Sequence, residues 1–339
     1  MGLKVHIYPA FNPRYYSPYI EGLRLLLGRS NLRYTKDGFP SFGSGCLALR
    51  IVNSNETRVY LHSDDMPELD ADGLRWSHVF GKVNLDPDLV PGEYRSKVFP
   101  LGPMFPVRVW DRLAAERRGL VNYILSRGRS DPIRKHIANY RGQYLSRFPE
   151  VDYHPSDSDP DYLFFNAAVW ERESVANDVR ARLVEAALRI DDLRFEGGLT
   201  PRETFKSDRR YDGSEYAPYL SKRYSPRENL EKTKASVVAF NNPAYRDCHS
   251  WRLAESMALG KAIITTPIVR ALPSPLDHGT HVHYVDGSVE SIEAAIRRIR
   301  SDNAYRAKLE SNARTYYETY LSPESVMRRV FEHVGVAIP

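Results

Sequence analysis

The stretch with the densest pattern of chemically useful residues runs from Asp247 to Lys261. Its residue types predict a loop, a helix capped by Gly260, and then a strand. The first turn of a helix exposes backbone N–H groups and carries a positive partial charge, and both favour phosphate. Arg252 would lie in that turn, where a guanidinium can grip phosphate with two hydrogen bonds. Glu255, one turn further on, could accept hydrogen bonds from two ribose hydroxyls.

Each of these residues also has a purely structural interpretation. Asp247 fits a helix N-cap or a loop acid, and Arg252 fits a salt bridge with Glu255 or Asp247. Glu255 fits a surface acid within a helix. Ser250 and Trp251, which directly precede Arg252, complete the predicted binding residues of this stretch, although packing is favoured over base stacking for Trp251.

Strands and helices alternate through the second half of the chain. Buried strands are predicted at Tyr162–Val169 and Ala235–Asn241, and further strands at Ala262–Thr266 and His281–Val285. A short strand at Leu193–Glu196 ends at Gly197 and Gly198. Helical spacing or capping signals mark Val175–Leu188, the region after Ser225, Trp251–Leu259, the region around Ile292–Ile299, and Tyr305–Tyr320. This alternation predicts parallel βαβ units in a doubly wound sheet, which binds ligands outside the carboxyl ends of its strands.

The first half is less regular. We expect strands at Lys4–Tyr8, Cys46–Val52 and Arg58–His62, and helices at Pro18–Leu27, Val109–Arg127 and Asp131–Arg147. Asp64 and Asp65 follow one strand at its carboxyl end, which suits a base that activates a hydroxyl group. His62 and His78 are further candidates for that role in the first domain.

The chain is predicted to divide near residues 150–160, where PEVDYHPSDSDPD has the composition of a linker. This gives a first domain at 1–155 and a second at 156–322. Ser322–Ser325 interrupts the last helical pattern. The final helix, Val326–Val334, lies within a segment at 323–339 that could cross back to the first domain.

Net charge, the length of the apolar runs and the number of cysteines limit the class of protein. The 339 residues carry a formal net charge of +5, which indicates either an acidic partner or a basic solvated surface. No apolar run is long enough to span a membrane. Cys46 and Cys248 are too far apart in the sequence to form a disulfide framework, so a cytoplasmic location is expected.

Two other clusters could bind metal. His278, His281 and His283 have a spacing that could bring imidazoles together, but no acid or cysteine completes the set. The Asp-x-Asp at Asp157–Asp159 could hold a divalent ion against a diphosphate, but its linker-like surroundings favour a solvated acidic segment. We therefore expect no metal site.

The stretch from Asp247 to Lys261 resembles the donor site of GT-B glycosyltransferases, especially the group 1 families. Their pattern is an acid, seven residues, Glu, a helix of small residues, Gly, Lys or Cys, Pro or Ala, and a β-branched strand. Glu255 matches the second acid, and Asp247 stands where those families usually have Glu. Gly279–Arg314, with its ESIEAAIRRI and NAR segments, is similar to the strand and helices that follow. The resemblance extends over Ala235–Tyr320.

The resemblance implies an α/β fold of the GT-B type, with two facing Rossmann-like domains and parallel sheets. It implies that Glu255 binds the donor and that Asp247, although a shorter acid than the family's Glu, faces the transferred sugar. The diphosphate-binding Arg and Lys of the family lack a clean match here. Arg172 is the best substitute, with Lys222 and Arg223 as competitors.

The expected reaction is transfer of a sugar from a nucleotide-diphosphate sugar to a saccharide or lipid-linked acceptor, without a metal or cofactor. The family's habits suggest bacterial surface polysaccharide or glycan synthesis in the cytoplasm or at the inner membrane face, with peripheral membrane contact as an open option and no nucleic-acid partner. Two alternatives stay open: a nucleotide-sugar epimerase on the same fold, and a non-catalytic nucleotide or nucleic-acid binding protein. The nucleotide, the sugar, the acceptor and the stereochemistry are left open.

Overall fold

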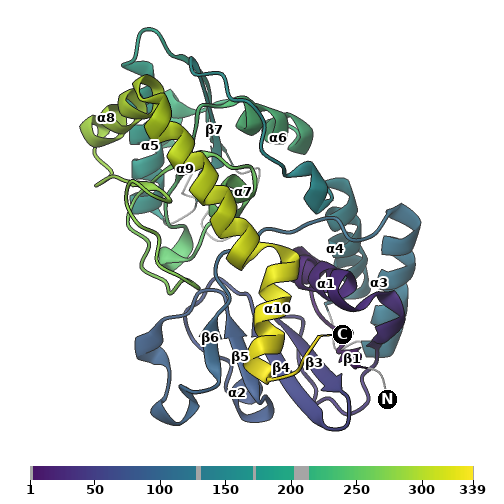
Figure 1. Cartoon of the computed structure of the whole chain (residues 1–339). Helices are drawn as coiled ribbons and strands as arrows, with labels where there is room; N and C mark the ends of the chain where they lie inside the picture. Colours follow the sequence, from purple (N-terminus) through teal and green to yellow (C-terminus); the bar gives the residue numbers. More distant parts are fainter. Residues whose placement is uncertain (1–2, 127–130, 171–172, 202–213, 339) are drawn as a thin grey trace. The chain divides into compact units, whose positions relative to one another are not determined.

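A computed structural model describes residues 3–126, 131–170, 173–201 and 214–338 (Figure 1). The chain forms two compact units. Unit 1 comprises Met1–Tyr153, Arg270–Ser274 and Glu318–Pro339, and unit 2 comprises His154–Val269 and Pro275–Tyr317. The last segment of the chain therefore belongs to the same unit as the first. Within the described residues, no helix is both long enough and apolar enough to cross a membrane.

Unit 1 contains a sheet of six strands in the order β2-β1-β3-β4-β5-β6. The strands are β1 (Lys4–Ile7), β2 (Leu32–Tyr34), β3 (Cys46–Val52), β4 (Glu56–His62), β5 (Val79–Lys82) and β6 (Val98–Pro100). The β2–β1, β4–β5 and β5–β6 pairs are parallel, whereas β3 runs antiparallel to both β1 and β4. The expected parallel order thus holds for this sheet except at β3, which a short connection joins to β4 as a hairpin.

Helices cover both faces of this sheet. They are α1 (Pro13–Leu27), α2 (Ala71–Trp76), α3 (Arg112–Ser126), α4 (Ile133–Leu145) and α10 (Pro323–Val334). Alternate residues of β3 show the two faces. Leu47, Leu49 and Ile51 belong to a core shared with α1 and α10, while Cys46 and Ala48 belong to a second core that includes Leu74 of α2.

The helices α1 and α10 approach each other closely at Gly22. A Cβ atom at Gly22 would lie only 1.9 Å from the Pro323 carbonyl oxygen, so the contact requires glycine. Helix α1 begins five residues earlier than predicted, because Asn12 caps it by accepting a hydrogen bond from Arg14 N at 3.0 Å and Pro13 suits a first turn. Pro18, the predicted start, lies inside the helix.

Unit 2 is built on parallel strands, as the sequence predicts. They are β7 (Tyr162–Ala168), β8 (Arg194–Thr200), β9 (Val238–Asn241), β10 (Ala262–Thr265) and β11 (His283–Tyr284). β7 pairs with β8, and β10 pairs with both β9 and β11. These pairings form a two-stranded and a three-stranded sheet. β9 lies next to β7, where Val237 N donates a hydrogen bond to Tyr162 O at 2.8 Å, so the five strands are together called the unit 2 sheet. The α/β fold class expected from the sequence is confirmed.

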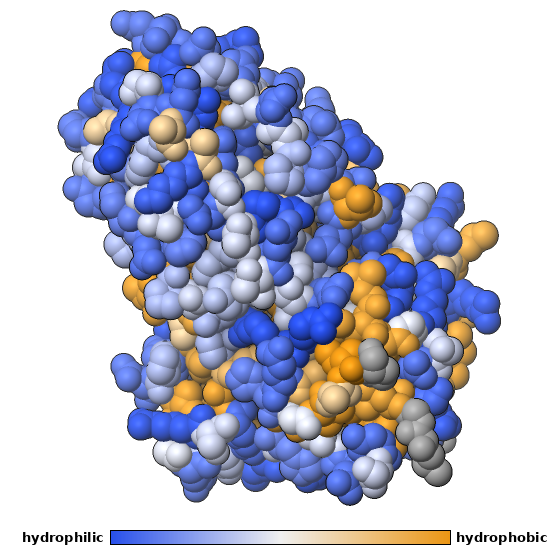
Figure 2. Space-filling model, in the orientation of Figure 1, coloured by the Kyte–Doolittle hydropathy of each residue, from blue (hydrophilic) through white to orange (hydrophobic). Residues whose placement is uncertain are grey.

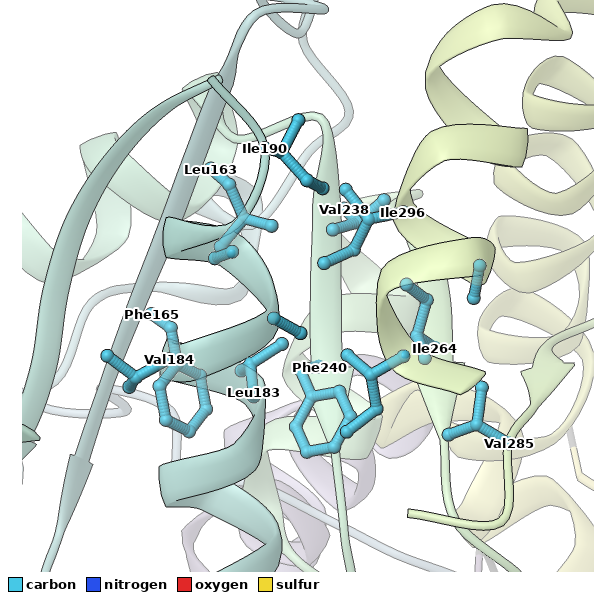
Figure 3. Packing of buried hydrophobic residues seen from close by; sticks show 14 of the residues in the cluster. Leu163, Phe165, Leu183, Val184, Ile190, Val238, Phe240, Ile264, Val285 and Ile296 are labelled. Carbon is cyan, nitrogen blue, oxygen red and sulfur yellow. The ribbon is translucent and has the colours of Figure 1, made fainter. Parts of the chain in front are cut away.

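The helices of unit 2 are α5 (Ser174–Leu188), α6 (Pro226–Ala235), α7 (Trp251–Ala258), α8 (Val289–Ser301) and α9 (Asn303–Tyr316). Figure 3 shows side chains of α5 and α8 packed against those of the strands, with Phe165, Phe240 and Ile264 meeting Leu183 and Ile296. The predicted capping box at Ser225 and the left-handed Gly260 after α7 are both present.

Some elements differ from the sequence-based prediction. β8 was expected to end before Gly197, but it continues through Gly197 and Gly198 to Thr200. These glycines adopt φ values of +110° and +137°, which other residues rarely reach, and so the strand passes through the predicted breaker. The short elements β2, β5, β6 and α2 were not predicted, because three to six residues carry too little periodicity.

Candidate functional site

The parallel strands of unit 2 end along one side of the sheet, which we call the carboxyl edge; the opposite side is the amino edge. Helix α7 begins at the carboxyl edge, directly after β9. Its N-cap is Ser250, whose hydroxyl accepts a hydrogen bond from Arg252 N at 3.2 Å. Ser250 therefore shapes the helix start, and the remaining N–H groups of the first turn are the ones suited to an anion. Trp251, the first residue of the helix, is partly buried.

The Arg252 side chain extends from this first turn to the end of β7. Its Nη2 donates a hydrogen bond to the Asn166 carbonyl oxygen, and the guanidinium carbon lies 5.0 Å from the centroid of the Phe165 ring. Among the described residues, no carboxylate forms an ion pair with Arg252. Burial lowers the pKa of Arg252, and the nearby charge of Glu255 acts in the opposite direction. A guanidinium that is hydrogen-bonded to a neutral carbonyl rather than to a carboxylate retains a charge that an anionic ligand can balance.

Asn166 holds this corner of the sheet together. Its Nδ2 donates to Thr200 Oγ1 at 2.8 Å and to Ser221 Oγ at 3.3 Å, and its Oδ1 accepts from Asn229 Nδ2 at 3.4 Å. The side chain thereby connects β7 with β8, with the segment before α6, and with α6 itself. Because its carbonyl also binds Arg252, Asn166 sets the position of the guanidinium.

Asp247 lies in a strained turn between β9 and α7. Arg246 and Asp247 have φ values of +49° and +61°, a left-handed conformation that is uncommon for residues other than glycine. Both residues are exposed. Glu173 lies near enough for electrostatic coupling: burial, followed by the charge of Asp247, raises the pKa of Glu173. The turn thus presents an acid at the carboxyl edge.

Arg180 supports the same edge from α5. Its Nε donates to Asn242 Oδ1 and its Nη1 to the Ala168 carbonyl oxygen, both at 3.0 Å. Asn242 follows β9 and Ala168 ends β7, so this buried arginine links the ends of two neighbouring strands. Its charge also opposes the rise in the pKa of Glu173.

The other predicted donor residues have different surroundings. Glu255 is partly buried in α7, one turn after Arg252. Lys222 and Arg223 are exposed just before α6, and Lys222 Nζ lies 4.9 Å from the centroid of the Tyr224 ring. Arg172 lies outside the described residues.

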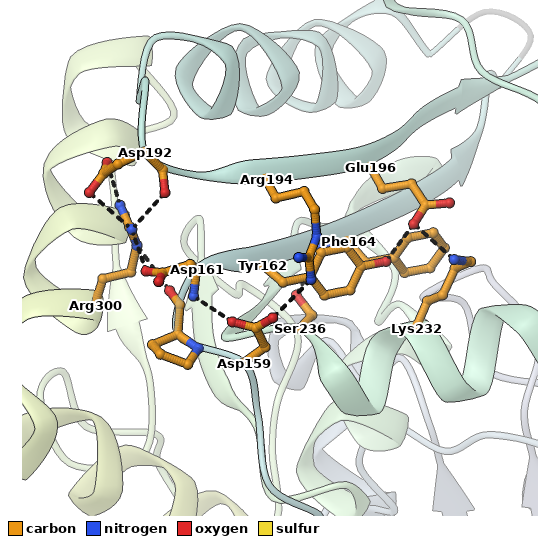
Figure 4. A network of polar contacts seen from close by, with 11 residues as sticks. Asp159, Asp161, Tyr162, Phe164, Asp192, Arg194, Glu196, Lys232, Ser236 and Arg300 are labelled. Carbon is orange, nitrogen blue, oxygen red and sulfur yellow. Dashed lines mark hydrogen bonds and ion pairs between the residues drawn. The ribbon is translucent and has the colours of Figure 1, made fainter.

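The amino edge of the same sheet carries a network of ion pairs (Figure 4). Arg194 Nη2 contacts Asp159 Oδ2 at 2.8 Å, and Arg300 binds Asp161 at 2.7 Å and Asp192 at 3.0 Å. Asp159 of the linker motif and the neighbouring Asp161 are therefore each paired with an arginine side chain. No group of three or more His, Cys, Asp or Glu side chains within the described part of the chain is arranged to hold a metal ion.

The three predicted histidines take part in local contacts, and two of them touch each other. His283 Nδ1 lies 2.7 Å from Tyr305 Oη, and the His278 and His283 rings are 4.7 Å apart. His281 Nδ1 accepts a hydrogen bond from Asp277 N at 3.1 Å. Burial lowers the pKa of His283 to about 4, so this side chain is neutral at neutral pH.

In unit 1, a charged cluster lies where β4 and β5 end. Asp64 forms an ion pair with Lys82, and its Oδ2 lies 3.2 Å from His62 Nε2. Burial alone would raise the pKa of Asp64, but His62 and Lys82 hold it below its usual value. Asp65 is not in this pairing; burial, followed by the charge of Asp64, raises its pKa. Asp65 is thus the acid of this cluster that binds a proton most readily.

The structure does not bring His78 to this cluster. His78 precedes β5, and its Nδ1 accepts a hydrogen bond from Arg58 N at 3.2 Å, near the start of β4. Asp64 follows the other end of β4, about 20 Å away at roughly 3.3 Å per residue. His78 and Asp64 therefore belong to opposite ends of the strand.

Three residues of these sites were not identified from the sequence. Asn166 lies in a continuous apolar run, Lys82 ends an unpredicted strand, and Arg180 lies within a helical pattern. A polar residue interrupting the buried strand YLFFNAAV was the one available signal, and it points to Asn166.

No family model and no curated protein matches this chain. Among solved structures, it is similar to the C-terminal domain of a group 1 family glycosyl transferase from Francisella tularensis, at 12% identity and a TM-score of 0.37, over 50% of this chain and 96% of that one. It is similar to sucrose-phosphate synthase from Thermosynechococcus elongatus at 14% identity and a TM-score of 0.40, over 76% and 73% of the two chains. A Listeria monocytogenes protein described as a UDP-N-acetylglucosamine 2-epimerase gives 10% identity and a TM-score of 0.37, over 77% and 69%. Group 1 glycosyltransferases, which the sequence resembles, are thus among these structures.

Proposed function

We propose that this chain is a glycosyltransferase that moves a sugar from a nucleotide-diphosphate sugar to a saccharide or glycolipid acceptor without a metal ion. The observation that carries the proposal is the state of Arg252 in the first turn of α7. Its guanidinium donates a hydrogen bond to the Asn166 carbonyl oxygen of β7 and has no carboxylate partner among the described residues. A helix N-terminus and such an arginine together form a site for a diphosphate.

The reaction assigns a role to each neighbouring group. As the glycosidic bond to the diphosphate breaks, negative charge develops on the leaving group, and Arg252 and the α7 N–H groups stabilise it. Lys222 and Arg223, both exposed just before α6, are the proposed partners of the outer phosphate. Glu255 accepts hydrogen bonds from the ribose hydroxyls.

Asp247 is the proposed partner of the transferred sugar. The transition state of glycosyl transfer resembles an oxocarbenium ion, and an exposed carboxylate beside the sugar stabilises its positive charge. The left-handed turn at Arg246 and Asp247 fixes the acid next to the start of α7.

We assign the acids that follow β4, Asp64 and Asp65, to activation of the acceptor hydroxyl. A hydroxyl must lose its proton as it attacks, and a base with a pKa above the usual carboxyl value is better matched to that task. Asp65 has such a raised pKa, whereas Asp64 is held by Lys82 and His62. We assign Asp65 to the acceptor and Asp64 to positioning. A hexosyl group as the transferred sugar, a role in bacterial surface polysaccharide synthesis and a cytoplasmic location are part of the same proposal.

A thermal-shift panel of UDP, GDP, CMP and ADP sugars tests the donor site. We expect one nucleotide to raise the melting temperature, and Glu255→Ala to reduce that shift. Glu231→Ala is the matched control, because Glu231 is an exposed acid of α6 in the same unit. If no nucleotide stabilises the protein, or if both variants behave alike, the donor site is wrong.

Product analysis separates the rivals. Transfer requires an acceptor, whereas an epimerase would convert the donor without one. A non-catalytic nucleic-acid binding protein would bind oligonucleotides in a salt-dependent way and leave every donor intact.

A further inference from the structure

A cavity of about 550 Å³ lies at the β2 side of the unit 1 sheet. It is open to solvent on one side and is lined by α1, the residues around β2, the segment before α3, and α3 itself. None of its lining residues belongs to the donor or acceptor groups described above. Four arginines line it, Arg24, Arg29, Arg117 and Arg118, together with a single acid, Asp111.

The charge of this lining is only partly balanced. Arg24 is paired with Glu21, and Asp111 Oδ1 accepts a hydrogen bond from Ala114 N at 2.8 Å as the cap of α3. Within the described part of the chain, Arg29, Arg117 and Arg118 have no carboxylate partner. Three guanidinium groups around one cavity favour an anion with several oxygen atoms, and phosphate is the group that arginine binds best.

Apolar side chains lie beside these arginines. Tyr34, Trp110 and Leu113 line the cavity, and the Arg118 guanidinium carbon lies 4.0 Å from the centroid of the Tyr34 ring. On α3, four large apolar residues are exposed: Leu113 by 79%, Leu120 by 49%, Val121 by 38% and Ile124 by 63%.

These four residues and Arg117 occupy successive positions on one helical face, at intervals of four, three, one and three. Figure 2 shows orange hydrophobic residues exposed among blue hydrophilic ones on the part of unit 1 that contains α3. A solvated helix face in a monomer does not require this combination of apolar and basic side chains.

We propose that the cavity and the exposed face of α3 form a docking site for anionic phospholipid at a membrane surface. The lipid phosphate binds Arg29, Arg117 and Arg118, and the apolar residues of α3 enter the boundary between headgroups and acyl chains. Such a helix lies along the surface and does not span the bilayer. Charge complementarity selects this occupant, since an apolar partner would leave three guanidinium groups desolvated without a counterion. The proposal does not depend on glycosyl transfer.

Vesicle flotation of the full chain tests the site. We expect binding to phosphatidylcholine vesicles that contain phosphatidylglycerol, little binding to phosphatidylcholine alone, and weaker binding as salt rises. Arg117→Gln should lower the partition coefficient about fivefold, the typical value for one basic residue near an anionic surface. The matched control is Arg95→Gln, an exposed arginine between β5 and β6 at the other side of the sheet. Leu113→Ser should also weaken binding, and melting curves monitor the fold.

Several outcomes would overturn the proposal. Equal losses in Arg117→Gln and Arg95→Gln would show attraction by net charge alone. Release of the protein from vesicles by millimolar inorganic phosphate would show a site for free phosphate. Binding to an oligonucleotide that requires Arg117, without binding to vesicles, would show a nucleic-acid site. A change in oligomeric state in Leu113→Ser would show that a second copy covers α3.

Discussion

At the amino edge of the unit 2 sheet, arginine side chains meet carboxylates: Arg194 pairs with Asp159, and Arg300 with Asp161 and Asp192. At the carboxyl edge of the same sheet, Arg252 binds a backbone carbonyl. The first arrangement satisfies the charge within the protein, and exposed pairs of this kind add little stability. The second leaves charge for a ligand. The contrast supports the proposal that the carboxyl edge binds an anion, and it rests on the partners of each arginine rather than on its presence.

Unit 1 has a related contrast along β4. Near its start, Arg58 and the exposed His78 form a local contact. After its end, Asp64 draws on the fully buried Lys82, whose pKa burial lowers. A buried charge is costly unless a partner of opposite charge compensates it. The buried charged pair of Lys82 and Asp64 lies at the carboxyl ends of β4 and β5, whereas the start of β4 has only an exposed contact.

Removing one arginine from each edge is the most direct test of the difference between the two edges. Arg252→Ala should lower kcat/KM for sugar transfer by about 100- to 1,000-fold, because a charged donor to the leaving group is lost. Arg194→Ala should change it less than twofold. Steady-state kinetics with saturating acceptor measure both, and equal effects would contradict the distinction between the edges.

The acids after β4 allow a second test. Asp65→Asn should slow transfer about 100-fold if Asp65 accepts the acceptor proton. In the wild type, the rate should rise with pH through a pKa above the usual aspartate value of 3.8, because the carboxylate is the active form and its pKa is raised. A pH–rate profile checks this. The proposal fails if the acidic limb persists unchanged in Asp65→Asn.

A substitution at Asn166 tests whether this residue holds Arg252 in position at the carboxyl edge. Asn166→Ala removes hydrogen bonds to Thr200, Ser221 and Asn229, and it should lower the free energy of unfolding by about 1–3 kcal/mol. It should also weaken nucleotide binding about tenfold, since the Asn166 carbonyl that accepts from Arg252 remains but loses the side-chain hydrogen bonds that hold it in place. Urea unfolding and calorimetric titration measure the two effects. Tyr162→Phe, which removes a hydroxyl from the amino edge, should leave nucleotide affinity unchanged.

The smallest effect is expected at Arg300. Arg300→Ala should lower the urea midpoint slightly, because the carboxylates of Asp161 and Asp192 are largely exposed although the Arg300 side chain is mostly buried, and it should not alter nucleotide affinity. Denaturation curves and the thermal-shift response test the two statements. A loss of nucleotide binding here would show that the amino edge belongs to the site.

The sequence predicts most of unit 2 because its strands are buried runs and its helices carry capping signals, such as the box that starts at Ser225. It places Arg252 in the first turn of α7 for the same reason. It cannot show that Arg252 reaches the Asn166 carbonyl, because that contact joins residues 86 positions apart. The pairing of Asp64 with Lys82 also cannot be predicted from the sequence. It depends on two neighbouring strands, one of which, β5, is too short to predict.

The contact between Gly22 and Pro323 has a consequence for synthesis of the protein. Helix α10 supplies Val326, Met327 and Phe331 to a core that the first strands of the chain also form. On a ribosome adding about 5–20 residues per second, roughly 15–60 s separate the emergence of α1 from that of α10. Throughout this interval the face of α1 that packs against α10 lacks that helix, while His154–Val269 and Pro275–Tyr317 are synthesised. The first part of the chain to be translated is therefore the last to complete its fold.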